Sequence, residues 1–133
     1  MKIKFIYKHL PLSFHQQALI SAQYFEAIAI QSEKKAFKFH DKLFMNQSKL
    51  KKGEAYLKTV AKELGVDLKK LAKDIKSDKI KQKINEHMTE AKQFGMSGTP
   101  GFIINGIPVK GALPAEHFVG IINMLKEKGK LNL

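Results

Sequence analysis

The chain has 133 residues, which fits one domain with its own hydrophobic core, and it has no cysteine, which excludes disulfides, thiolate metal sites and cysteine nucleophiles. No apolar run reaches the roughly 18 residues of a membrane-spanning helix. The net charge is +12, but all 24 basic residues are lysines interleaved with Asp and Glu, a pattern typical of solvated helix faces and of weak, salt-sensitive attraction to polyanions rather than of specific nucleic-acid recognition.

The first predicted element is a strand over residues 2–8, where Ile, Phe and Tyr alternate loosely with lysine. Pro11 ends this strand, because proline has no backbone N–H and pushes the residue before it into an extended conformation. Ser13 and Gln16 have the spacing of a capping box, in which each side chain bonds the other residue's backbone N–H. We therefore expect a helical region that starts at Ser13 and runs to about residue 94.

Within residues 13–94, apolar side chains recur every three or four positions, the spacing of amphipathic helices. Gly65 and Gly95 are each placed to close a helix. Asp67 and Ser77 are each placed to open one, because their side-chain oxygens can accept a bond from the first helical turn. The expected order is a helix after Ser13, a second at about 33–45, a loop at 46–53, a third at about 54–64, a short helix after Asp67 and a last one from Ser77 to Gly95.

Two short strands are expected next, over residues 102–109, joined at Asn105-Gly106, the dipeptide most typical of tight hairpins. Pro114 suits the first turn of a final helix, where its missing N–H needs no replacement. That helix carries apolar residues at helical spacing, namely Phe118, Ile121, Ile122 and Leu125. The whole order of strand, helical block, hairpin and helix predicts an α/β fold.

No pattern in the chain predicts a catalytic residue or a bound cofactor. The sequence has no serine nucleophile elbow, no phosphate-binding loop and no dinucleotide fingerprint. No two histidines have the spacing of a zinc-binding helix, so we expect no metal site and structural or surface roles for all five. These are His9, His15, His40, His87 and His117.

Several motifs, in this order and spacing, resemble the DsbA-like family of thioredoxin-fold disulfide oxidoreductases. They are Tyr7 to His15, Phe37 to Phe44 with Asn46-Gln47, Ala61 to Asp67, Gly98-Thr99-Pro100, Phe102 to Gly106 and Gly111 to Pro114. The resemblance extends through most of the chain and implies one thioredoxin-like domain over residues 1–133, with residues 13–94 as a helical insertion. It also implies a periplasmic or exported protein, although this chain contains no signal peptide.

The resemblance assigns roles to two residues. In the family, the proline of the Gly-Thr-Pro motif is cis, and its loop lies beside the redox cysteines, where neighbouring backbone groups pair with an extended substrate peptide. By the same resemblance, Thr99 would face the thiols and tune them. The expected substrate-binding residues are therefore Thr99 and Pro100, and the expected partner is an extended peptide or protein.

The chain departs from the family at its beginning. A DsbA-like domain has a strand and a Cys-x-x-Cys helix before the strand predicted at residues 2–8, and this sequence has neither. Because disulfide exchange requires a thiolate, the resemblance implies the C-terminal part of an oxidoreductase without its own redox cysteines, hence an incomplete fold. The alternative is a non-enzymatic peptide-binding or dimerising module that has lost the thiols.

In the family, the missing strand lies between residues 2–8 and the hairpin at 102–109, so its loss leaves an open sheet edge. Three arrangements could provide hydrogen-bond partners for the backbone groups of that edge. Residues 2–8 could pair directly with residues 102–104, a second copy could supply a strand and form a homodimer, or the natural protein could begin upstream.

Overall fold

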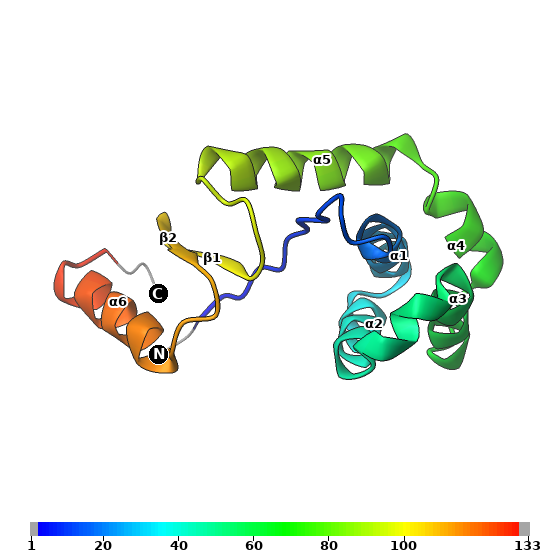
Figure 1. The fold of residues 1–133 in the computed structure, drawn as a ribbon, viewed down its shortest axis with the longest axis horizontal. Coiled ribbons are helices and arrows are strands. Elements are labelled where there is room, and N and C mark those ends of the chain that lie inside the picture. Colours follow the sequence, from blue (N-terminus) through cyan, green and yellow to red (C-terminus); the bar gives the residue numbers. More distant parts are fainter. Residues whose placement is uncertain (1–2, 131–133) are drawn as a thin grey trace.

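The structure is a computed structural model that describes residues 3–130. Figure 1 shows helices α1 to α4 gathered at one end, the hairpin and α6 at the other, and α5 running between the two ends. The N-terminal segment runs as an extended chain from the α6 end towards α1. The elements are α1 (Ala18–Gln31), α2 (Glu33–Met45), the 3-10 helix η1 (Gln47–Lys52), α3 (Glu54–Glu63), α4 (Leu68–Asp74), α5 (Asp78–Gln93), β1 (Gly101–Ile104), β2 (Ile107–Lys110) and α6 (Ala115–Glu127).

The predicted helix starts at Asp67 and Ser77 are confirmed. The Asp67 side chain accepts a hydrogen bond from the Lys70 N–H at 3.1 Å, and the Ser77 hydroxyl accepts one from the Ile80 N–H. Each bond satisfies a donor of the first helical turn that has no partner within the helix. None of the helices in residues 3–130 is both long and apolar enough to cross a membrane.

The strand predicted at residues 2–8 is wrong for residues 3–8, which form no regular secondary structure, while residue 2 lies outside the described residues. The sheet contains β1 and β2 alone among the described residues, so direct pairing of the N-terminal segment with residues 102–104 is also wrong. The backbone N–H and C=O groups of a strand need hydrogen-bond partners on a neighbouring strand. Alternating side chains alone do not provide that neighbour.

Two further local predictions are corrected. The capping box at Ser13 does not form, because residues 13–17 make turns and α1 begins only at Ala18, without a side-chain cap. The predicted loop at 46–53 is mostly the 3-10 helix η1, in which Leu50 packs against the core. A short polar stretch without internal Gly or Pro can still wind into a helical turn when one apolar side chain is buried by it.

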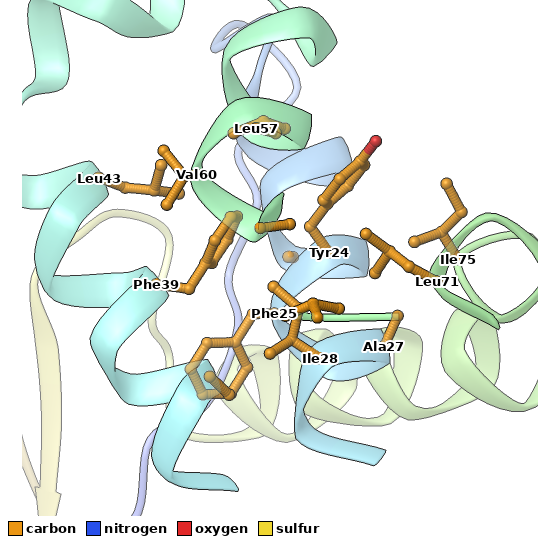
Figure 2. Close-up of a cluster of buried hydrophobic side chains, with 14 of the residues drawn as sticks. Tyr24, Phe25, Ala27, Ile28, Phe39, Leu43, Leu57, Val60, Leu71 and Ile75 are labelled. Carbon is orange, nitrogen blue, oxygen red and sulfur yellow. The ribbon is translucent and has the colours of Figure 1, made fainter. Parts of the chain in front are cut away.

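The core lies among α1 to α5 (Figure 2). Tyr24 of α1 and Phe39 of α2 are fully buried, and their rings stack with centroids 6.2 Å apart. The Tyr24 hydroxyl donates a 2.8 Å hydrogen bond to Glu54 at the start of α3. Burial raises the pKa of Tyr24, and the Glu54 carboxylate adds to the effect, so this phenol stays a donor. The other fully buried large side chains are Ile28, Leu57, Val60, Leu71 and Ile84.

The hairpin and α6 form a smaller packing unit. β1 and β2 are antiparallel, and the two-residue turn at Asn105-Gly106 confirms the predicted hairpin. Phe102 of β1 packs edge-on against Phe118 of α6, with ring centroids 4.9 Å apart, and Val109 of β2 and Leu125 of α6 are buried. This packing fixes the position of β1 and therefore of the loop that precedes it.

Candidate functional site

The residues that the sequence singled out, Thr99 and Pro100, lie in the short loop between α5 and β1. The peptide bond between them is cis, and residues 97–100 are all exposed. The loop is followed at once by β1, so its backbone continues directly into the edge of the hairpin. A peptide that lay along β1 would therefore also meet the Thr99-Pro100 bond.

The loop is held at both ends by backbone hydrogen bonds. At the end of α5, the Gly95 N–H donates to the Lys92 carbonyl at 3.0 Å, and the Met96 N–H donates to the Ala91 carbonyl at 2.8 Å. This pair of bonds closes a helix when the glycine adopts the left-handed conformation, and Gly95 has φ +71°. At the other end, the Pro100 carbonyl accepts a 2.9 Å bond from the Gly111 N–H, which ties the loop to the end of β2.

We expect Gly95→Ala to lower the free energy of unfolding by about 1–2 kcal/mol, because a side chain at positive φ is strained. The matched control is Gly98→Ala in the same loop, where an added Cβ meets no atom within 4 Å and φ is not in that region. This control should change stability by less than about 0.5 kcal/mol. Urea unfolding of both variants checks the prediction, and equal effects would contradict it.

β1 has one paired and one free edge. Because Ile104 and Ile107 flank a two-residue turn, they form the hydrogen-bonded pair that closes the hairpin, and bonded and unbonded pairs then alternate. Ile103 faces Pro108, which has no N–H to donate, in an unbonded pair. The N–H and C=O groups of Gly101 and Ile103 therefore point away from β2. Within residues 3–130, no other strand pairs with this edge.

A second polar cluster lies between the N-terminal segment and two helices. His9 of the N-terminal segment and Glu26 of α1 are each only 5% exposed. The His9 Nε2 atom lies 2.9 Å from the Glu26 Oε1 atom. The Lys83 ammonium group of α5 lies 2.8 Å from the other oxygen, Oε2. Burial alone would raise the pKa of Glu26, but the hydrogen bonds and charges of His9 and Lys83 outweigh it and lower the pKa to about 2. Glu26 is thus a carboxylate with both oxygens satisfied.

His87 of α5 completes this cluster. Its Nδ1 atom accepts a hydrogen bond of 3.1 Å from the His9 backbone N–H, and the two imidazole rings stack with centroids 5.6 Å apart. Lys8 forms an ion pair with Glu90, one turn further along α5. Burial lowers the pKa of His87, and the neighbouring positive groups lower it further. His87 is therefore neutral at pH 7 and able to accept.

Sequence reasoning did not find this cluster. His9 is 17 residues from Glu26 and 78 from His87, so no motif links them. The residues next to His9 in sequence, Leu10 and Pro11, do not indicate which side chains it will contact in the folded chain. In the described part of the chain, no group of three or more His, Asp or Glu side chains could hold a metal ion.

The comparisons with known proteins bear on the fold. A family model, described as DSBA-like thioredoxin domain, matches residues 2–123, which is most of the chain. No curated protein and no solved structure was found to match. The helices and the antiparallel hairpin agree with an incomplete α/β fold of thioredoxin type, as the sequence predicted. The chain therefore belongs to the family of DSBA-like thioredoxin domains.

Proposed function

We propose that this chain is the substrate-holding, C-terminal part of a DsbA-like thiol–disulfide oxidoreductase. The observation that carries the proposal is the free edge of β1 immediately after the exposed Thr99-Pro100 loop. An extended peptide that adds to such an edge gains main-chain hydrogen bonds, which do not depend on its sequence. Thr99 and Pro100 then lie at the end of the bound peptide, as substrate-binding residues.

The redox step itself requires groups from outside this chain. Disulfide exchange proceeds by attack of a thiolate on a disulfide sulfur, and the chain has no cysteine. No residue here is therefore assigned a catalytic role, and no cofactor is needed for holding a peptide. In this proposal residues 1–133 belong to one domain, and residues 13–94 are a helical insertion whose last helix, α5, leads into the loop.

The test is binding of a short fluorescent peptide of alternating Val and Thr, without cysteine, followed by anisotropy. Ile103→Pro removes one outward N–H of β1 and no bond to β2, so we expect about tenfold weaker binding. The matched control is Ile103→Thr, which keeps the N–H, changes the side chain and should bind within about threefold of the parent chain. If the parent chain does not bind the peptide, or if both variants bind equally, the proposal fails.

A single introduced cysteine locates the bound peptide. Since the chain has none, Thr99→Cys and Lys69→Cys each create one thiol, the first in the loop and the second on α4. Each is reacted with the same peptide carrying a pyridyl disulfide and with a small pyridyl disulfide; the attacking thiolate forms the mixed disulfide and releases pyridine-2-thione. We expect the peptide to react at least about tenfold faster than the small reagent at position 99, because binding raises its local concentration. At position 69 the two rates should be similar.

The alternative is a non-enzymatic peptide-binding or dimerising module. It predicts the same peptide binding, or a homodimer through the free edge of β1, without any redox activity. The mass of the protein from its native cell, with its thiols counted by alkylation, separates the two. A longer species with two cysteines supports the oxidoreductase, whereas a species of about 15 kDa without thiols supports the module.

A further inference from the structure

The N-terminal segment, residues 3–10, is attached to the helices without any strand pairing. Tyr7 packs against Phe25 of α1, and His9 lies buried between α1 and α5. We propose that the contact between His9 and His87 is a pH-sensitive latch, which holds this segment on α5 at neutral pH and loosens it on acidification. The proposal does not depend on the function proposed above.

The chemistry of the latch lies in one hydrogen bond. The His9 backbone N–H can only donate, so the Nδ1 atom of His87 must present a lone pair, and the neutral ring carries its proton on Nε2. Protonation of His87 places a hydrogen on Nδ1, which then faces another donor. The bond is lost, and the amide of His9 is left buried without its acceptor.

Once the His87 ring is protonated, the charges around it destabilise the closed contact. The N-terminal segment contributes His9, which stacks on the ring, and Lys8, and α5 itself contributes Lys83; all three oppose a positive charge on His87. α1 contributes Glu26, which favours the protonated ring, but its two oxygens are already bonded to His9 and Lys83. Glu90 on α5 is likewise paired with Lys8.

The released segment is apolar and exposed. Ile3, Phe5 and Ile6 are 70%, 74% and 61% exposed even while the latch is closed. Their backbone groups form no ladder with the sheet, so His9 is one of few fixed points between this segment and α5. Acidification therefore changes the mobility of an apolar segment while leaving the helical core intact.

The test is amide hydrogen exchange by NMR, expressed as protection factors so that the intrinsic pH dependence of exchange is removed. Between about pH 7.5 and about pH 5.5 we expect the protection factor of the His9 amide to fall at least about tenfold. The fall should begin near pH 6.5, where the His87 ring of an opened segment binds a proton, and continue towards the lower pH at which the ring titrates in the folded chain. Amides of α2 and α3 should keep their protection.

Two variants sharpen the test. In His87→Asn the side-chain oxygen takes the place of Nδ1 and cannot be protonated, so the protection of His9 should not change with pH in this range. His117→Asn, at an exposed histidine of α6, should behave like the parent chain. The proposal is overturned if His87 titrates while His9 stays protected, if the fall persists in His87→Asn, or if the α2 and α3 amides lose protection in parallel.

Discussion

Replacement of Phe39 by alanine is expected to lower the free energy of unfolding by about 3–5 kcal/mol, the largest effect of any single truncation proposed for this chain. Phe39 is 0% exposed, and its ring stacks on Tyr24 between α1 and α2. Its removal leaves a cavity in the core that the surrounding helices cannot fill completely. The destabilisation includes both the lost transfer of the ring and the cavity.

Phe44→Ala provides a matched control on the same helix. Phe44 is 58% exposed, and its ring contacts His40 near the surface of α2. The same atoms are deleted, but most of them already lie in water, so we expect a loss below about 1 kcal/mol. Urea unfolding of the two variants, with unchanged m-values, measures the difference. Similar losses for Phe39 and Phe44 would contradict this description of the core.

The parts of the fold that sequence predicted well are those decided by local chemistry. Asp67 and Ser77 open their helices because one side-chain oxygen and one backbone N–H, three residues apart, are sufficient. Asn105-Gly106 makes its turn for a similarly local reason, since both residues accept positive φ. Each of these features lies within about four residues, so no knowledge of the tertiary structure is needed.

The prediction of an N-terminal strand failed because a strand is not decided by local chemistry. Residues 3–8 have strand-like composition, but a strand exists only if another strand offers its hydrogen-bonding groups. Such a partner strand must come from residues that are distant in sequence, and the local composition of residues 3–8 does not reveal whether it is there. Thr99 and Pro100 could be singled out because the Gly-Thr-Pro motif is contiguous, whereas His9, Glu26 and His87 are brought together only by the packing of α1 and α5.

Glu26 is the polar residue whose loss should destabilise the chain most. We expect Glu26→Gln to lower the free energy of unfolding by about 3 kcal/mol at pH 7, because one pKa unit corresponds to about 1.4 kcal/mol and the pKa of Glu26 falls from 4.5 to about 2 on folding. The amide keeps the shape but cannot accept from both His9 and Lys83. The His9 imidazole and the Lys83 ammonium group then lose the carboxylate that both of them contact.

The matched control is Glu63→Gln, at a carboxylate that also pairs with a lysine, Lys42 at 2.9 Å, but is half exposed. Solvent screens that pair, so the loss should stay below about 1 kcal/mol. A difference between the two variants therefore measures burial rather than the presence of an ion pair.

The pH dependence of the Glu26 effect gives the decisive check. Because the folded state holds Glu26 ionised down to about pH 2, protons bind the unfolded chain first as the pH falls below 4.5. The stabilisation by Glu26 is therefore fully present above that pH and is lost towards pH 2. The parent chain should lose stability in this window while Glu26→Gln does not lose it from this source, so their difference in unfolding free energy should shrink. A difference that stayed constant between about pH 6 and about pH 3 would mean that Glu26 stabilises the fold by packing and hydrogen bonding alone, without its charge.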